Sequence, residues 1–277
     1  MIDFNKTIFE NTREKPIICA HRGISGGNIP CNTLPAFKAA LYQGAEMIEL
    51  DVSKAKDGEF FVFHPGMEIP HMKTRRKIPN LTSKGVGKLR FFNFDDTETQ
   101  FGVEKLEDIL DFLKGKCYIN VDKFWIDIEG ISAVIRKCGV EKQVVVKTGI
   151  KDNYINDIKK YAADFMYLPV IRAEDKITDS LVEQGINCVG AEILFDKESA
   201  PVISDEYIES MHNKGRVIFV NSIVYDYKVV LTAGHNDDSA ISENMDNAWG
   251  WLIDKKADII QTDWCSLLKD YMDTRSK

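Results

Sequence analysis

The sequence predicts a (β/α)8 barrel, the α/β fold in which eight parallel strands alternate with helices. Three observations support this prediction: apolar runs of strand length recur, segments with helical periodicity separate most of them, and polar residues follow the ends of the runs. With 277 residues, 44% of them hydrophobic, and no Pro/Gly/Ser linker, residues 1–277 are expected to form a single domain. A doubly wound sheet is the alternative fold.

Eight apolar runs have the length of β-strands. They lie at about 16–20, 46–52, 116–121, 143–147, 165–170, 187–192, 216–220 and 258–262. The helical segments between them lie at 34–43, 103–114, 126–138, 152–162, 177–184, 205–213 and 244–255. Strands and helices that alternate in this way are typical of a parallel barrel.

One segment, from about residue 65 to 102, interrupts this alternation. It contains several glycines, an acidic patch and a basic cluster of Lys73, Arg75, Arg76 and Lys77. We interpret it as an insertion after strand two, where inserted material overhangs the mouth of a barrel. The basic cluster is expected to be a solvated surface, with contact to a phosphate or a membrane surface as the alternative.

The composition narrows the classes of partner. A formal charge of −7 argues against a nucleic-acid partner, so an anionic substrate must be held by a metal or by a few local cations. Six cysteines are scattered without CxxC spacing, as in proteins of a reducing compartment. The first residues lack a basic region followed by an apolar core, and no run of about 18 apolar residues occurs. We therefore expect a cytoplasmic protein without stable membrane insertion; the sequence does not indicate its oligomeric state.

Two carboxylates share one face of the second predicted strand. Glu49 and Asp51 stand at positions i and i+2, while the apolar residues around them take the other face. Hard oxygen ligands of this kind suit Mg²⁺ or Ca²⁺, and His21 and His64, which flank the pair in the sequence, can move protons beside such an ion.

Polar residues at the ends of the other runs extend this pattern. They are His21, Glu49 with Asp51, Asp122, Lys147, Glu192, Asn221 and Asp263. In a parallel barrel the carboxyl ends of all strands meet at one rim, where active sites form. Taken singly, His21 is more simply a histidine beneath a tight Arg-Gly turn and His64 a strand-end surface residue. Together with the two carboxylates, the catalytic interpretation is favoured, whereas His71, His212 and His235 are expected at the surface.

Several motifs resemble the glycerophosphodiester phosphodiesterase family. They are His21-Arg-Gly23, Asn32-Thr-Leu-Pro-Ala-Phe37, Gly44-Ala-Glu-Met-Ile-Glu-Leu-Asp51, Lys56-Asp-Gly58, His64 and the ending Ala257-Asp-Ile-Ile-Gln-Thr-Asp263. The resemblance implies a (β/α)8 barrel with an insertion after the second strand. It also implies divalent-cation-dependent hydrolysis of a small-molecule glycerophosphodiester to glycerol 3-phosphate and an alcohol.

The resemblance also assigns roles to residues. It makes His21 and His64 the general acid/base pair. It makes Glu49, Asp51 and Asp122 the metal ligands, with Asp122 in the place of a family Glu. Arg22 and Lys123 become the phosphate-binding cations, with Lys147 a weaker candidate.

The chain also departs from the family pattern. Cys31 stands where the family usually has Glu, and Pro65 follows the second histidine where Asp is common. The strand-seven motif is reduced to Val220-Asn-Ser222. We expect Cys31 to be a neutral residue that lines the site, and neither a nucleophile nor a metal ligand, because a soft thiolate is poorly matched to Mg²⁺ or Ca²⁺.

Two other functions remain open from the sequence. One is a related barrel enzyme with sphingomyelinase D or lysophospholipase D activity, with Met67, Met72 and Phe91-Phe92 of the insertion against a lipid tail. The other is a catalytically weak barrel that binds an anion, to which only Cys31 and Asp122 point.

Overall fold

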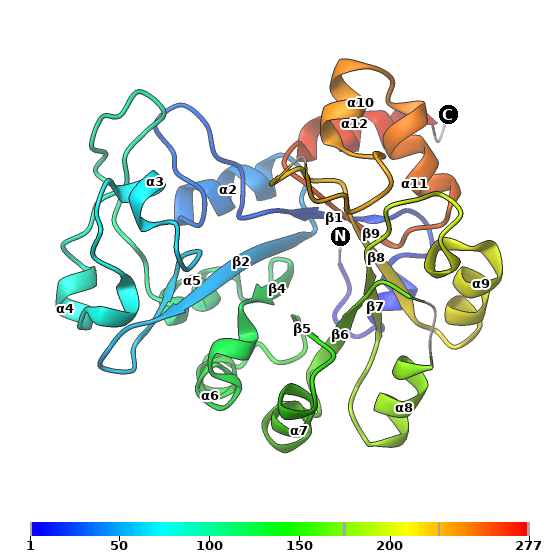
Figure 1. Ribbon diagram of the computed structural model, residues 1–277, viewed down its shortest axis with the longest axis horizontal. Helices are drawn as coiled ribbons and strands as arrows, with labels where there is room; N and C mark the ends of the chain where they lie inside the picture. Colours follow the sequence, from blue (N-terminus) through cyan, green and yellow to red (C-terminus); the bar gives the residue numbers. More distant parts are fainter. Residues whose placement is uncertain (1, 174–175, 227, 276–277) are drawn as a thin grey trace.

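A closed ring of eight parallel strands forms the centre of the protein, seen in a computed structural model that describes residues 2–173, 176–226 and 228–275 (Figure 1). The strand order is β1-β9-β8-β7-β6-β5-β4-β2, and the pairing of β1 with β2 closes the ring. The strands are β1 (Ile17–Ala20), β2 (Met47–Lys54), β4 (Tyr118–Asp122), β5 (Val144–Gly149), β6 (Met166–Ile171), β7 (Gly190–Ile193), β8 (Val217–Asn221) and β9 (Ile259–Thr262). The predicted barrel is confirmed, and closure excludes the doubly wound sheet.

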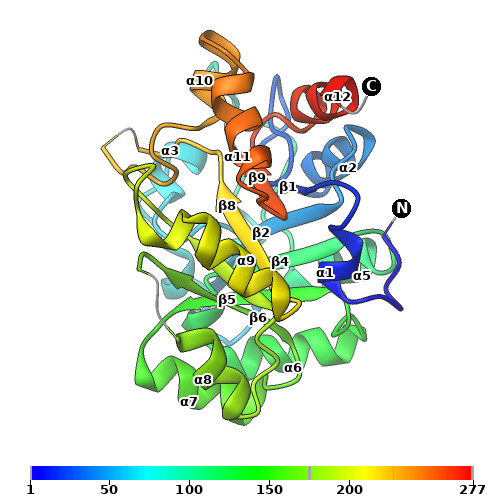
Figure 2. The ribbon, with the colours of Figure 1, turned by 90° about the vertical axis from the view of Figure 1, so that its right-hand side faces the viewer.

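Most of the helices surround the ring. The helices are α1 (Ile8–Asn11), α2 (Leu34–Tyr42), α3 (Glu68–Met72), α4 (Ser83–Val86), α5 (Leu106–Leu113), α6 (Ile128–Cys138), α7 (Asp152–Tyr161), α8 (Ile177–Glu183), α9 (Asp205–Asn213), α10 (Asp237–Ser242), α11 (Trp251–Asp254) and α12 (Cys265–Arg275). Helix α1 packs against the apolar cluster inside the ring, and α3 and α4 belong to a separate region. Figure 2 shows α9 lying across the outside of the strands, where Tyr207, Ile208 and Met211 join the main apolar core. None of the helices in the described parts of the chain has the length and apolar run that crossing a bilayer needs.

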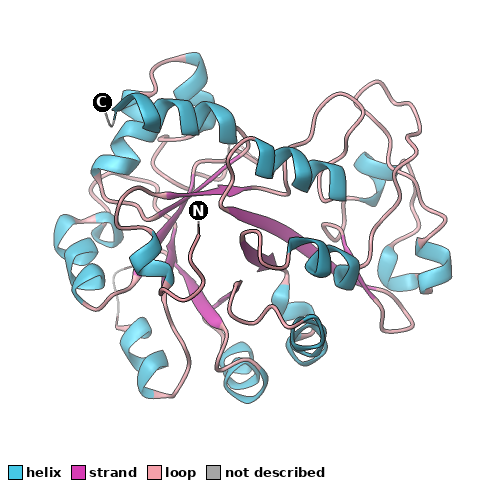
Figure 3. Cartoon of the chain, turned by 180° about the vertical axis from the view of Figure 1, so that it is seen from behind, coloured by secondary structure: helices cyan, strands magenta, loops and turns pink. Residues whose placement is uncertain are grey.

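The interior of the barrel has two layers. At the N-terminal ends of the strands the inward side chains are apolar and form one cluster with Ile8 of α1; they include Cys19, Met47, Tyr118, Val145, Leu168, Phe219 and Ile259. In Figure 3, seen from behind, the N-terminal segment begins over the middle of the ring. Two residues further along the same strands come Glu49, Asn120, Lys147, Asn221 and Gln261. Because alternate residues share a face, these polar side chains form the layer above the apolar plug.

The segment after β2 lies outside the ring. A short strand, β3 (Phe60–Val62), pairs antiparallel with the end of β2. After it come α3 and α4, which project to the left in Figure 1. Nine buried residues give this region an apolar cluster of its own: Ala55, Phe61, Phe63, Met72, Ile78, Val86, Leu89, Phe91 and Val103.

The C-terminal third differs in detail from the expected helices. The segment expected as a helix at 244–255 is a π-helical turn, Asp246–Gly250, that continues into α11. Helix α10, and α1 near the other end of the chain, are not predicted by the sequence, since six and four residues give little periodicity to detect. Helix α12 was also missed, although its buried residues Cys265, Leu268 and Met272 follow helical spacing.

Candidate active site

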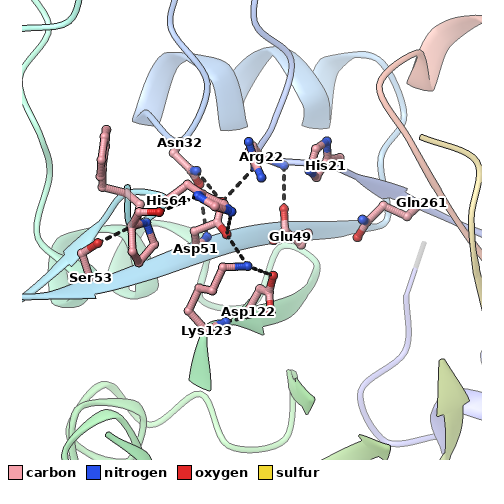
Figure 4. Close-up of polar contacts among 12 residues, drawn as sticks. His21, Arg22, Asn32, Glu49, Asp51, Ser53, His64, Asp122, Lys123 and Gln261 are labelled. Carbon is pink, nitrogen blue, oxygen red and sulfur yellow. Dashed lines mark hydrogen bonds and ion pairs between the residues drawn. The ribbon is translucent and has the colours of Figure 1, made fainter. Parts of the chain in front are cut away.

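Three carboxylates meet at the C-terminal end of two adjacent strands. In the parallel pairing of β2 with β4, Glu49 lies opposite Asn120 and Asp51 lies opposite Asp122. One oxygen atom from each of Glu49, Asp51 and Asp122 lies within 4.8 Å of the other two (Figure 4). Glu49 is 2% exposed and Asp51 is fully buried. The structure thus brings together the three carboxylates that the sequence pointed to as metal ligands.

The carboxylate of Asp51 is the centre of the site. Its Oδ2 atom lies 2.9 Å from Nε of Arg22 and accepts a hydrogen bond of 2.9 Å from Nδ2 of Asn32. Its Oδ1 atom accepts no hydrogen bond within the described residues, and Nζ of Lys123 (3.4 Å) and Nε2 of His64 (3.8 Å) lie nearby. A buried anionic oxygen without a donor is costly unless a cation binds it. An all-carboxylate donor set with such an oxygen fits a hard divalent cation.

The protein drives the pKa values of two of these carboxylates apart. Burial, together with the charge of Asp51, raises the pKa of Glu49 to about 7. Burial also acts to raise the pKa of Asp122, but the charges of Lys147 and Lys123 outweigh it and hold that pKa at about 2. At neutral pH Asp122 is therefore ionised, while Glu49 is protonated in part of the molecules.

The two histidines sit on either side of the carboxylates. Nδ1 of His21 lies 3.0 Å from Oδ1 of Asp263. Burial lowers the pKa of His21, but the hydrogen bond to Asp263 and the charge of Glu49 outweigh it, so the pKa is raised overall. His21 is therefore the histidine more disposed to hold a proton.

His64 has the opposite character. Its Nδ1 lies 3.0 Å from the carbonyl oxygen of Pro65, which can only accept, so Nδ1 is the protonated nitrogen and Nε2 faces Asp51 with its lone pair. Burial lowers the pKa of His64 despite the charge of Asp51. The backbone of Pro65, at a position where the family commonly has Asp, orients this ring.

Three cations border the carboxylates. The backbone N–H of Arg22 donates to Oε2 of Glu49 (2.9 Å), in addition to the contact of its side chain with Asp51. Nζ of Lys123 donates to Oδ2 of Asp122 (2.7 Å). Lys147 is buried and paired at 2.7 Å with Glu192, and its charge also acts on Asp122.

A cavity of about 520 Å³ opens above these residues. His21, His64, Glu49, Asp122 and the three cations line it together with Arg172, and Trp125, Leu194, Ile223, Tyr225 and Leu231 provide apolar lining. Such a cavity can hold an anionic group against the charged side and a less polar group against the apolar residues.

Sequence reasoning did not identify every residue of this region. Asn32 belongs to one of the motifs, but the sequence does not predict that its side chain binds Asp51. Sequence reasoning also gave no role to the chain of side-chain hydrogen bonds from Gln261 to Asn221 (3.0 Å) and from Asn221 to Glu192 (2.8 Å). Loop conformation and side-chain direction create these contacts, and neither has a periodic signal; only the strand-end positions of Asn221 and Glu192 hinted at them.

Cys31 is partly buried near Arg22. Burial raises the pKa of its thiol to about 12, with the Arg22 charge opposing the shift. The thiol is therefore neutral at physiological pH, as expected from the sequence.

The expectation for the remaining histidines is wrong in two cases. His235 is 9% exposed, stacked on Trp251 with ring centroids 3.9 Å apart. His212 is largely buried and lies 2.7 Å from Asp258 through its Nε2 atom. His71 is partly buried and makes edge contacts with Phe63 and Phe91. His235 and His212 satisfy packing and hydrogen bonds away from the carboxylate cluster, whereas His71 lies beside His64 in a small pocket.

The insertion offers little support for a lipid-binding role. Met72 and Phe91 are buried in the apolar cluster of the insertion, at 4% and 1% exposure, and Met67 packs against it. Residues buried in a local core cannot cover a lipid tail without unfolding that core. Phe92, the remaining residue of this set, is half-buried. The burial of Met72 and Phe91 thus takes two of the four residues away from the proposed contact with a lipid tail.

The fold and the site define an α/β barrel with a cluster of acidic residues, able to hold a metal ion, between two histidines at its mouth. The chain is 30% identical over 153 residues to a glycerophosphodiester phosphodiesterase of Caldanaerobacter subterraneus, an alignment that covers 53% of this chain and 54% of that relative. The chain thus matches about half the length of this relative. A family model described as a domain of unknown function matches residues 167–272.

Solved structures match over almost the whole chain. A glycerophosphoryl diester phosphodiesterase from Parabacteroides distasonis superposes with a TM-score of 0.75 at 19% identity, over 94% of this chain and 87% of that one. An Oleispira antarctica phosphodiesterase, solved in complex with the product sn-glycerol-3-phosphate, superposes with a TM-score of 0.68 at 17% identity, over 93% of this chain and 97% of that one. At these identities the structures show the fold. The fold of this chain is thus similar to that of these phosphodiesterases, and about half of its sequence is similar to that of the Caldanaerobacter relative.

Proposed function

We propose that this protein is a metal-dependent glycerophosphodiester phosphodiesterase, which hydrolyses a glycerophosphodiester to glycerol 3-phosphate and an alcohol. The observation that supports this most directly is the convergence of Glu49, Asp51 and Asp122 between His21 and His64 at the mouth of the barrel. The name of the Caldanaerobacter relative and the product complex of the Oleispira enzyme support the same reaction.

The three carboxylates are the proposed ligands of the divalent cation. Mg²⁺ and Ca²⁺ are the ions that prefer such oxygen donors. When bound, the ion supplies a positive charge that neutralises the phosphate oxygens and favours ionisation of the attacking hydroxyl. The protein contributes by burying Glu49 and Asp51 and by keeping Asp122 ionised.

The histidines divide the proton transfers between them. His64 is the proposed general base, because its pKa is lowered and its Nε2 atom is free to accept the proton of the attacking hydroxyl, from water or from the glycerol moiety. His21 is the proposed general acid, because Asp263 helps it to remain protonated. As the bond between phosphorus and the leaving oxygen breaks, the proton of His21 passes to that oxygen and the neutral alcohol departs. Attack by water gives glycerol 3-phosphate directly, whereas attack by the glycerol hydroxyl gives a cyclic phosphate that water must then open.

Arg22 and Lys123 are the proposed contacts of the substrate phosphate. Both side chains line the cavity. Because the protein has a net charge of −7, these local cations, and not a general positive field, must attract the anionic substrate.

A turnover assay tests the proposal. Glycerophosphocholine, glycerophosphoethanolamine and glycerophosphoglycerol are incubated with the protein and with Mg²⁺, Ca²⁺ or Mn²⁺, and glycerol 3-phosphate release is measured. We expect release with at least one substrate and one ion, and none after removal of the ion with a chelator. No release in any combination, or release that survives chelation, contradicts the proposal.

A further inference from the structure

Lys123 donates a hydrogen bond to each carboxylate oxygen of Asp122, a proposed metal ligand. Strand β4 ends at Asp122, and the next residue, Lys123, has a left-handed backbone with φ of 60°. Its backbone N–H donates to Oδ1 of Asp122 (2.7 Å) and its Nζ atom donates to Oδ2 (2.7 Å). A cation that binds Asp122 must therefore share or replace a contact of Lys123.

The same ammonium group also reaches a second carboxylate. Nζ of Lys123 lies 3.4 Å from Oδ1 of Asp51, the buried oxygen that accepts no hydrogen bond within the described residues. Figure 4 shows Nζ between the carboxylates of Asp51 and Asp122. A divalent ion that binds both carboxylates would lie close to this ammonium group, and two cations at such a distance repel each other strongly in a buried site.

Neither of the other cations is arranged in this way. The side chain of Arg22 contacts Oδ2 of Asp51 and does not contact Oδ1, the oxygen that is available to a cation. Lys147 has Glu192 as its own partner at 2.7 Å, and its side chain is only 7% exposed. Arg22 contacts a second carboxylate, Glu49, only through its uncharged backbone N–H. Among these three residues, Lys123 is the one whose charged group lies within 4 Å of two of the clustered carboxylates.

The backbone indicates that this arrangement is built into the fold. Arg22, Asn32 and Lys123 all have positive φ, at 58°, 57° and 60°, and all three contact the carboxylate of Asp51. Left-handed backbone is disfavoured for residues with a side chain and persists where surrounding contacts impose it. Two of these residues are cations, so the fold fixes the backbone positions from which Arg22 and Lys123 reach the carboxylate of Asp51.

The ammonium group of Lys123 can also move away from Asp122 into the cavity. Its side chain is 19% exposed and lines the cavity, and its Nζ atom lies 5.2 Å from the ring centroid of Trp125, which borders the same cavity. A phosphate group in the cavity offers a new anionic partner to an ammonium group that leaves Asp122.

We propose that Lys123 is a tethered competitor of the divalent cation and is released to the substrate phosphate when the cation binds. This inference rests on the proposed function and extends it to regulation of the same site. The consequence is positive coupling: the phosphate stabilises the displaced ammonium group, so phosphate strengthens cation binding, and the cation strengthens phosphate binding by the same factor.

Calorimetric titration of Mg²⁺ tests this inference without a turnover measurement. Mg²⁺ is added to chelator-treated protein with and without saturating glycerol 3-phosphate. For Lys123→Met we expect Mg²⁺ to bind on the order of tenfold more tightly than to the parent when no phosphate is present. The gain in Mg²⁺ affinity caused by glycerol 3-phosphate should fall by a similar factor, which lies within the usual range of coupling between sites.

Two further variants complete the test. Lys123→Arg keeps a cation on the same backbone and should keep both the weaker Mg²⁺ binding and the coupling. Lys54→Met removes a lysine at the end of β2 that pairs with Asp127, and this variant should bind Mg²⁺ as the parent does. The inference is overturned, and the proposed function is not, if Lys123→Met binds Mg²⁺ no more tightly than the parent or if the coupling is unchanged. If the parent binds no Mg²⁺, Ca²⁺ or Mn²⁺, the proposed metal-dependent function fails with it.

Discussion

Asp51 is the residue on which the contacts of the site converge, so its removal should be the most damaging single change. We predict that Asp51→Ala abolishes Mg²⁺ binding and turnover, because it removes the buried oxygen available to a cation and leaves Arg22 and Lys123 without their shared partner. Calorimetry and circular dichroism measure binding and fold. A folded variant that binds Mg²⁺ or Ca²⁺ as the parent does would exclude Asp51 as a ligand.

The histidines allow a prediction about pH as well as rate. His21→Ala and His64→Ala should each lower kcat by at least ~10²-fold, as is typical when a general acid or base is removed. In the parent, activity should decrease at pH values below the lowered pKa of His64, because the base is then protonated. It should also decrease at pH values above the raised pKa of His21, because the acid has then lost its proton. Rate profiles at saturating Mg²⁺ measure both limbs. Near-parental rates in either variant would contradict the two-histidine mechanism.

Glu49 should make the metal-free protein less stable as the pH rises. Its pKa is about 7 in the folded protein against about 4.5 in the unfolded chain, so the folded state holds the proton more tightly. Stability is therefore lost as the pH rises through this window, since the unfolded state ionises more easily. Glu49→Gln does not titrate and can still accept the hydrogen bond of Arg22.

Thermal unfolding in the presence of a chelator measures this effect. The melting temperature of Glu49→Gln minus that of the parent should be larger at pH 8 than at pH 5. An equal difference at both pH values would mean that Glu49 ionises at its ordinary pKa.

At the scale of the element, the strands were predictable and the loops that complete the site were not. Alternation in β2 put Glu49 and Asp51 on one face, and the order of strands in a barrel puts β4 beside β2. The direction of the Lys123 side chain depends on a left-handed residue, and the orientation of His64 depends on a backbone carbonyl. Single left-handed residues and carbonyl contacts arise from tertiary structure and leave no pattern in the sequence.

The insertion after β3 should behave as a unit with its own stability. Phe91 is 1% exposed in the apolar cluster of this region, which is separate from the barrel core. Phe91→Ala should cost about 3–5 kcal/mol within that cluster, as for other buried aromatic truncations. Hydrogen exchange should therefore speed up at residues 65–102 and change little in the strands β5 to β8. A uniform increase over the whole chain would show that the insertion and barrel unfold together.

At the scale of the whole molecule, the barrel separates the residues that stabilise it from those proposed to act. The apolar plug lies at the N-terminal ends of the strands and the carboxylate cluster at their C-terminal ends, as in barrels generally. Helix α1 closes the plug with Ile8, which is 2% exposed, and a hydrogen bond of 2.9 Å joins Asn11 to the hydroxyl of Tyr118. Stability and metal binding should therefore respond to different substitutions.

Ile8→Ala tests this separation. Loss of the buried side chain should lower the free energy of unfolding by about 2–5 kcal/mol, because it removes apolar contacts and leaves a cavity beneath the barrel. The Mg²⁺ affinity and kcat/KM of the folded protein should stay at the parental values, since the polar layer that contains Glu49 lies above the plug. Denaturant unfolding and calorimetry, both at 25 °C, give the two quantities. A parallel loss of Mg²⁺ affinity would mean that the plug also sets the geometry of the carboxylates, and that the two ends of the barrel are mechanically coupled.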